Sequence, residues 1–149
     1  MYTTQLLTPE HFKWAVQVAG KNMIMHEVKR PELYHRASLE GLANRIMMDG
    51  TGVLAFFNGR PVGAIGGVLV PHIYNPNIIV LSELMWYVLP QYRNGRAGLL
   101  LIKEFKKLAE ELADEATLST LPSSDIKEET LAKLGFHYGE KAFHYIKGK

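Results

Sequence analysis

Apolar residues follow a helical spacing in the first third of the chain, and this spacing changes after residue 50. The first helical pattern begins at Thr8 and Pro9, residue types that commonly start helices. Its apolar positions recur every three or four residues at Phe12, Ala15, Val16, Ala19 and Met23. A second pattern of the same kind occupies residues 31–48. The sequence therefore predicts two successive helices, preceded by a short strand at residues 3–7.

The middle of the chain has the composition of β-strands. Asn58 and Gly59 lie between two apolar segments, and this dipeptide favours a two-residue hairpin turn. A later apolar segment contains one acidic residue, Glu83. The predicted strands occupy residues 53–57, 61–70 and 78–89.

The second half of the chain alternates between helical and extended patterns. The predicted elements are a helix at 99–113, a strand at 116–121, a helix at 125–134, and a closing hairpin of strands at 136–138 and 142–147. The complete order is β-α-α-β-β-β-α-β-α-β-β, which predicts an α/β fold with a mixed, mostly antiparallel sheet flanked by helices. Because the chain has 149 residues and no repeat, we expect a single domain, 1–149.

Composition and charge exclude several classes of function. The absence of cysteine excludes disulfide frameworks, thiolate metal sites and thiol catalysis. The 17 basic and 15 acidic residues are balanced and form no basic stripe of the kind that binds nucleic acid. No apolar run approaches the ~18 residues of a membrane span, and the first residues lack signal-peptide features. We expect a cytoplasmic protein that binds neither nucleic acid nor membranes.

The most specific chemical pattern joins the strand at 78–89 to the helix at 99–113. Arg93 and Arg96 lie in the connecting loop, which also has small residues at positions 95, 97 and 98. Small residues let a ligand approach the backbone, and the following helix presents N–H groups to an anion. The loop is therefore suited to binding phosphate oxygens. A plain β-loop-α connection with surface arginines explains the same residues equally well.

The segment Val88-x-Pro90-x-Tyr92-Arg93, with its Gly/Ala-rich loop and apolar helix, resembles the acetyl-CoA-binding motif of GCN5-related N-acetyltransferases (GNAT). Arg93 and Gly98 occupy the first and last positions of the family loop, and Arg96 occupies the position of its central glycine. The element order matches the family fold over nearly the whole chain. The resemblance implies a transferase that moves an acetyl group from the cosubstrate acetyl-CoA to a primary amine of a small molecule or protein.

The resemblance also implies roles for single residues. The strand end at Tyr87 and Val88 would bind the pantetheine arm through backbone groups. The position of the family's usual tyrosine acid is held by Leu131, so no general acid is assigned, although Tyr87 or Tyr138 would be substitutes. An alternative reading is a catalytically inactive GNAT-fold module with a structural or regulatory role. The residues expected to wrap the pyrophosphate are Arg93, Asn94, Gly95, Arg96, Ala97 and Gly98.

Glu83 is the candidate general base. An alkyl amine has a pKa near ~10.4, so only about one molecule in ~10^3.4 is neutral at pH 7, and a base must remove its proton. Glu83 is the only charged residue in an apolar strand, where an acid without a role or partner is costly. Strict alternation of side chains along the strand places Glu83 on the same side as Met85 and Tyr87. A bulge nearby would change which side chains share that side. The alternative is a structural carboxylate that pairs with a basic residue or caps a strand edge.

Other polar and aromatic residues are weaker candidates. His72 and Tyr74 precede the strand of Glu83 and are possible pocket residues. His137 and His144 have no evident third ligand, so no metal site is predicted. The C-terminal segment concentrates aromatic residues, which suggests a homo-oligomer because a two-stranded edge buries one face only. These aromatic residues are Phe136, Tyr138, Phe143 and Tyr145.

Overall fold

The protein contains one five-stranded sheet, seen in a computed structural model that describes residues 1–121 and 124–149. The strands follow the order β1-β2-β3-β4-β5; neighbours are antiparallel except β5, which is parallel to β4. The predicted mixed, mostly antiparallel sheet is confirmed. The strands are β1 (Tyr2–Leu6), β2 (Gly50–Phe57), β3 (Arg60–Pro71), β4 (Ile79–Val88) and β5 (Glu115–Thr117).

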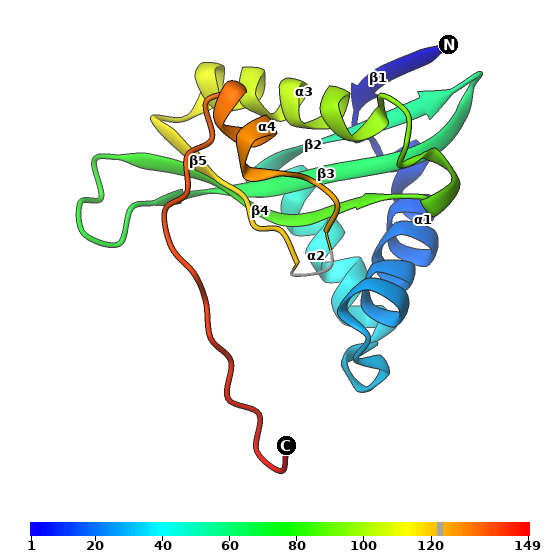
Figure 1. Ribbon diagram of the computed structural model, residues 1–149, viewed down its shortest axis with the longest axis horizontal. Helices are drawn as coiled ribbons and strands as arrows, with labels where there is room; N and C mark the ends of the chain where they lie inside the picture. Colours follow the sequence, from blue (N-terminus) through cyan, green and yellow to red (C-terminus); the bar gives the residue numbers. More distant parts are fainter. Residues whose placement is uncertain (122–123) are drawn as a thin grey trace.

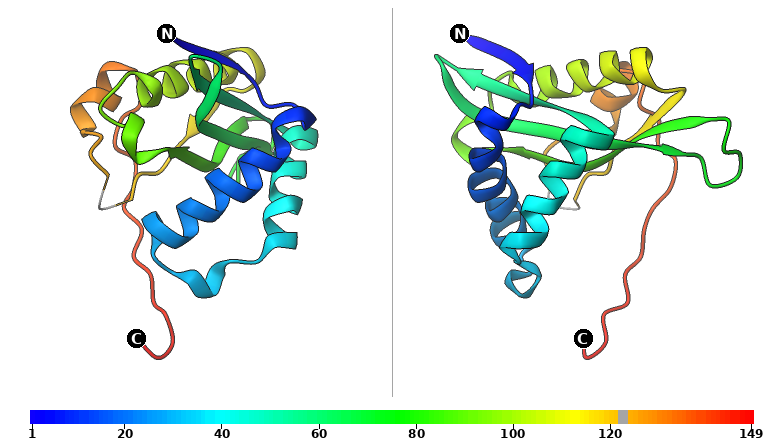
Figure 2. Two further views of the ribbon diagram at one scale, coloured as in Figure 1. Left: turned by 90° about the vertical axis from the view of Figure 1, so that its right-hand side faces the viewer. Right: turned by 180° about the vertical axis from the view of Figure 1, so that it is seen from behind.

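Helices cover both faces of the sheet (Figures 1 and 2). One face carries α3 (Ala97–Leu112) and α4 (Glu128–Lys133), and the other carries the N-terminal helical segments and α2 (Arg36–Asp49). A short turn, η5 (Pro90–Tyr92), connects β4 to the loop before α3. The N-terminal segments are η1 (Pro9–His11), α1 (Phe12–Trp14), η2 (Ala15–Gly20), η3 (Met23–Val28) and η4 (Pro31–Leu33).

The core lies on both sides of the sheet. On one side, Leu101 and Phe105 of α3 are fully buried against strand residues such as Ile65. On the other side, the small side chains of Ala15 and Ala19 let the N-terminal helix pack closely on the sheet. Each fully buried large side chain contributes roughly 1.5–3 kcal/mol, so α3 is held firmly beside the end of β4.

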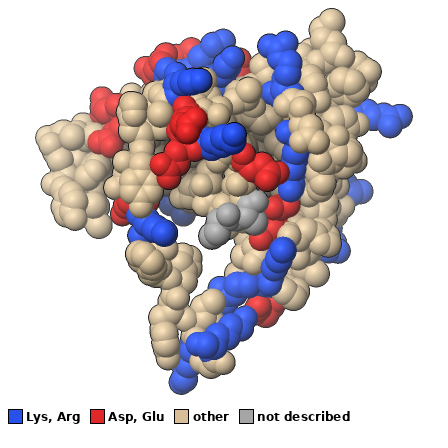
Figure 3. Space-filling model, in the orientation of Figure 1, with Lys and Arg blue, Asp and Glu red and all other residues tan. Residues whose placement is uncertain are grey.

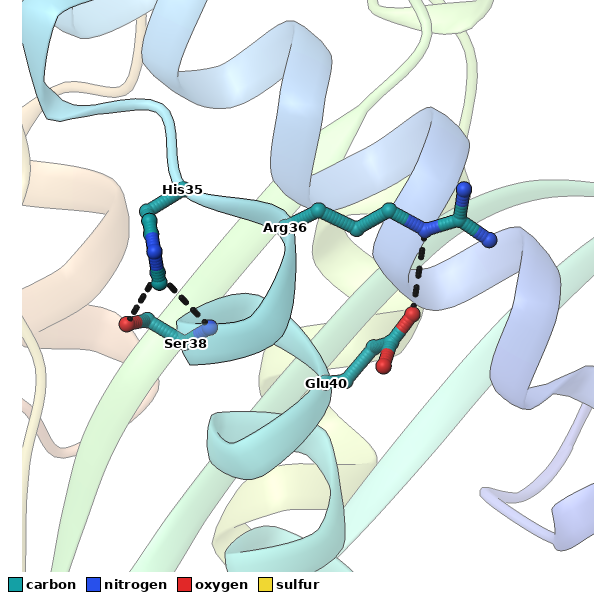
Figure 4. A network of polar contacts seen from close by, with 4 residues as sticks. All are labelled: His35, Arg36, Ser38 and Glu40. Carbon is teal, nitrogen blue, oxygen red and sulfur yellow. Dashed lines mark hydrogen bonds and ion pairs between the residues drawn. The ribbon is translucent and has the colours of Figure 1, made fainter.

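The two N-terminal helices differ from the prediction in their regularity. The first helix continues as far as Val28, and its segments η2 and η3 have wide π-helical turns. It ends at Lys29, which has a left-handed φ of 58°. The second is interrupted, because His35 is extended and caps α2 by accepting a hydrogen bond from the Ser38 N–H at 3.2 Å. Figure 4 shows this cap beside an ion pair of Arg36 and Glu40. Wide helical turns are frequent at functional sites.

The closing hairpin predicted at 136–138 and 142–147 is wrong. Residues 136–149 form no strand in the part of the chain that the structure describes, and they run away from the sheet (Figure 1). An isolated hairpin is marginally stable in water, and β5 offers a neighbouring edge of only three residues. As a result, Tyr138, Phe143 and Tyr145 are 65%, 85% and 86% exposed.

The surface carries charges of both signs. Figure 3 shows lysine and arginine side chains interspersed with acidic ones on the face that carries the C-terminal segment. Within residues 1–121 and 124–149, no helix is both long enough and apolar enough to cross a membrane.

Candidate active site

A bulge in β4 lies beside the point where β4 and β5 separate. Along the β3–β4 register Gly67 faces Glu83, whereas the next pair is Gly66 with Met85, so Leu84 is an extra residue. A Cβ placed on Gly67 would lie 2.8 Å from a backbone carbon of β4, closer than a side chain tolerates. The absence of a side chain at this position therefore lets the bulged strand approach β3.

The bulge changes which side chains of β4 share a face. Met85 and Tyr87 pack with the N-terminal helices, whereas Val88 packs in the core beneath α3. Leu81, before the bulge, also packs beneath α3, and alternation places Glu83 on this same face. Glu83 is therefore separated from Met85 and Tyr87, with which strict alternation had grouped it.

Glu83 bridges β4 and the segment that follows β5. The two strands pair only from Val80 with Glu115 to Ser82 with Thr117. Immediately beyond, the Glu83 Oε1 atom accepts a hydrogen bond from the backbone N–H of Ser119 at 3.1 Å. The carboxylate therefore lies where the two segments begin to separate.

Burial changes the acidity of Glu83. Desolvation raises the pKa of this carboxyl above its ordinary value of 4.5, and the hydrogen bond from Ser119 opposes the rise. A carboxylate with a raised pKa is a better proton acceptor at neutral pH. Such perturbed groups in clefts are typical of functional sites.

The separating segments enclose a cleft of about 280 Å³. Its walls are the end of β4, the wide helical turns of η3, the first residues of α3 and the chain after β5. The lining residues are Met23, Glu27, Val28, Glu83, Trp86, Tyr87, Val88, Arg93, Gly98, Ser119, Thr120, Leu121, Ser124, Asp125 and Ile126.

The structure brings some of the predicted site residues together and leaves others outside the cleft. Glu83, Tyr87, Val88, Arg93 and Gly98 all line it. The remaining loop residues have other surroundings, since Ala97 is fully buried in the core and Gly95 lies against Tyr2. Asn94 and Arg96 are exposed beside the cleft.

The loop geometry explains why arginine is accommodated at position 96. Arg96 has φ −92° and ψ −5°, an ordinary right-handed conformation that needs no glycine. Gly98 differs, because a Cβ there would meet nothing within 4 Å and would point into open space. Of these two positions, Gly98 is therefore the one where the lack of a side chain leaves room for a ligand.

Arg93 makes three contacts inside the cleft. Its Nη2 atom lies 2.5 Å from the Glu27 Oε1 atom, and its Nε donates a hydrogen bond to the Val88 carbonyl oxygen at 2.8 Å. The guanidinium carbon also lies 5.3 Å from the centre of the Tyr87 ring. Burial raises the pKa of Tyr87 above 10.0 although Arg93 lowers it, so the phenol is protonated at neutral pH.

Several cleft residues were missed by sequence reasoning. Glu27 lies in the π-helical turns of η3 and Trp86 follows the bulge in β4, and both side chains line the cleft. Neither the π-helical turns nor the β4 bulge produces a clear periodic pattern in the sequence. In contrast, His72 and Tyr74 lie in the β3–β4 connection, where their rings are 5.6 Å apart and Tyr74 is 89% exposed. Neither His72 nor Tyr74 is among the described residues that line the cleft.

The model of the acetyltransferase (GNAT) family matches residues 21–136, which is most of the chain and includes the whole cleft. The protein belongs to this family. Among curated proteins, no sequence matches the chain.

Solved structures of other proteins share the fold over nearly the whole chain at low identity. The aminoglycoside acetyltransferase meta-AAC0020 from an uncultured soil metagenomic sample is 13% identical, with a TM-score of 0.72 and coverage of 99% of this chain and 96% of its own. The aminoglycoside acetyltransferase AAC(6')-Iy, in complex with a CoA bisubstrate analog, is 16% identical, with a TM-score of 0.70 and coverage of 99% and 98%. A transcriptional regulator from Bacillus halodurans C-125 is 15% identical, with a TM-score of 0.75 and coverage of 98% and 99%.

Proposed function

We propose that the protein is an N-acetyltransferase that moves the acetyl group of acetyl-CoA to a primary amine. The observation that carries this proposal is the position of Glu83, a half-buried carboxylate with a raised pKa that lines the cleft at the point where β4 and the segment after β5 begin to separate. Family membership supports acyl transfer, and a solved relative is named in complex with a CoA bisubstrate analog. The acceptor is a small molecule or a protein.

The cleft residues fit the cosubstrate. The N-terminus of α3 presents backbone N–H groups, and Gly98, in its first turn, lines the cleft with open space at its Cβ position. The guanidinium of Arg93 suits phosphate oxygens. Beyond its pairing with β5, the edge of β4 at Val88 would receive the amide groups of a pantetheine arm, in place of the Arg93 Nε–H that the Val88 carbonyl now accepts.

The proposed chemistry requires proton removal from the acceptor. The bound thioester supplies an electrophilic carbonyl carbon and a thiolate leaving group. Glu83 takes a proton from the ammonium group of the acceptor, directly or through water, and offsets a handicap of roughly 4.6 kcal/mol at pH 7. The neutral nitrogen then bonds to the carbonyl carbon and the C–S bond breaks. Tyr87, a protonated cleft tyrosine, is the proposed donor of a proton to the departing sulfur, and it recovers a proton from the nitrogen as the amide forms.

Calorimetric titration with acetyl-CoA tests this function most directly. We expect a dissociation constant in the micromolar range, followed by thiol release when a panel of primary amines is added. Absence of heat and of a thermal shift at millimolar acetyl-CoA would overturn the proposal and favour the inactive GNAT-fold module.

Replacing Gly98 with valine is expected to weaken acetyl-CoA binding at least tenfold, about 1.4 kcal/mol, because the added methyl groups fill cleft space beside the first turn of α3. The fold should be retained, since a Cβ at this position meets nothing within 4 Å. Gly139→Val is the matched control, because its Cβ also meets nothing within 4 Å and it lies outside the cleft. Unchanged affinity in a folded Gly98→Val variant would contradict the assigned site.

We also propose that the protein self-associates through its exposed C-terminal aromatic residues. Light scattering at tens of micromolar should show a particle larger than the 16.8 kDa chain, because burying Phe143 and Tyr145 removes apolar area from water. Phe143→Ser should reduce the mass towards that of one chain. Tyr74→Ser removes a similarly exposed aromatic residue from the β3–β4 connection and should leave the mass unchanged. A 16.8 kDa particle for the unaltered protein would exclude self-association.

A further inference from the structure

Arg93 and Glu27 form the closest ion pair in the cleft. The Nη2–Oε1 distance is 2.5 Å, and the two side chains are 32% and 23% exposed, so the pair is shielded from water on most sides. Glu27 belongs to η3, whereas Arg93 follows β4 and η5. The pair therefore connects the N-terminal helical wall of the cleft to the loop that precedes α3.

These contacts compete with the proposed role of Arg93. N–H groups that are bonded to a carboxylate are not available for a paired contact with phosphate oxygens. The Val88 carbonyl, which is proposed to receive the pantetheine arm, already accepts the Arg93 Nε–H at 2.8 Å. Arg93 thus occupies part of the space and the bonding groups that the cosubstrate needs.

We propose that Arg93 changes partners when the cosubstrate binds, leaving Glu27 for the phosphate, and that the released Glu27 carboxylate then binds a cationic group of the acceptor. This inference rests on the proposed function. Removing one partner from a partly buried ion pair leaves an uncompensated charge, which is unfavourable until another cation replaces it. Glu27 lines the same cleft as Glu83. An acceptor with a second positive charge beside its reacting amine places one positive group at each carboxylate, Glu27 and Glu83.

The partner exchange makes binding of the two substrates cooperative. Before the cosubstrate binds, Glu27 is neutralised by Arg93 and attracts a cationic acceptor weakly. Afterwards the carboxylate is available, so the acceptor binds more tightly to the complex than to the empty protein. By reciprocity, a cationic acceptor strengthens cosubstrate binding by the same factor.

A double-mutant cycle with coenzyme A as the probe tests the exchange. Glu27→Gln is expected to tighten coenzyme A binding by about twofold to tenfold, because Arg93 no longer has to leave an anionic partner. Arg93→Gln should weaken binding, and adding Glu27→Gln to it should have no further effect. Glu32→Gln is the control, since this carboxylate pairs with Arg30 at 3.7 Å outside the cleft and its loss changes the net charge equally.

A second titration tests the acceptor step, using 1,4-diaminobutane and n-butylamine with and without saturating coenzyme A. We expect coenzyme A to increase the affinity for the diamine only, and Glu27→Gln to abolish this increase. Equal affinities for the two amines would overturn the role of Glu27 in acceptor binding.

The outcomes also separate this inference from the proposed function. Coenzyme A affinity that is unchanged or weaker in Glu27→Gln, while the unaltered protein binds normally, would overturn the exchange and leave the proposed function intact. Failure of the unaltered protein to bind coenzyme A would overturn both.

Discussion

Replacing Glu83 with glutamine is expected to lower acetyl transfer by about 10²–10⁴-fold, the usual cost of losing a general base. Affinity for acetyl-CoA should barely change, because glutamine keeps the shape of the side chain and an oxygen that accepts the Ser119 N–H. Turnover with any active amine, measured by thiol release, checks the first expectation, and calorimetry checks the second.

The pH dependence of this variant provides a further check. The rate of the unaltered protein should rise as pH increases through the raised pKa of Glu83, where the carboxyl loses its proton. The difference between the two proteins should shrink at high pH, because the acceptor amine is then neutral without a base. A rate deficit that is equal at all pH values would indicate that Glu83 does not act as the base.

Stability should change in the opposite direction to activity. The folded-state pKa of Glu83 is raised above 4.5, so its contribution to stability is fully present below the unfolded value and is lost as pH rises through the folded value. At neutral pH the buried carboxylate is therefore unfavourable, and Glu83→Gln should raise the melting temperature. This gain should disappear below about pH 4.5. A lowered melting temperature with normal turnover would identify Glu83 as a structural carboxylate.

Replacing Gly67 with alanine is expected to destabilise the protein by about 3 kcal/mol, at the upper end of the cost of overpacking. The new Cβ would lie 2.8 Å from a backbone carbon of β4, and a backbone moves less readily than a flexible side chain. Denaturant unfolding measures this loss. Because Gly67 faces Glu83 across the bulge, the surviving folded fraction should also show a lower rate at saturating acetyl-CoA.

Gly41→Ala is the matched control for this substitution. Gly41 lies within α2, and a Cβ there meets nothing within 4 Å. Alanine at an exposed helical position should stabilise the protein by roughly 0.5–1 kcal/mol without changing turnover. If Gly67→Ala were as stable as this control, the bulge would not depend on the missing side chain.

Local sequence patterns were sufficient to predict most elements of the sheet and its covering helices. Asn58 and Gly59 adopt φ values of 49° and 82°, the left-handed conformations that the hairpin turn requires and that these two residue types accept readily. The helix predicted at 99–113 corresponds to α3, whose Leu101 and Phe105 are fully buried in the core. These predictions succeeded because turn chemistry and periodicity depend on neighbouring residues in the chain.

The closing strands were predicted wrongly for the opposite reason. Alternating aromatic residues indicate an extended chain, but a strand exists only where a neighbouring strand pairs with it. β5 ends at Thr117 after three residues, and nothing in the local pattern of residues 136–149 reports the length of that edge.

By itself, the sequence determined the α/β class, the strand-loop-helix with Arg93 and Gly98, and the choice of Glu83 as the unusual charge in β4. The tertiary structure alone decided how these residues meet. The bulge opposite Gly67 sets the face of Glu83, and the π-helical turns bring Glu27 to Arg93. The bulge depends on pairing between β3 and β4, and neither the bulge nor the π-helical turns leave a periodic signal in their own segments.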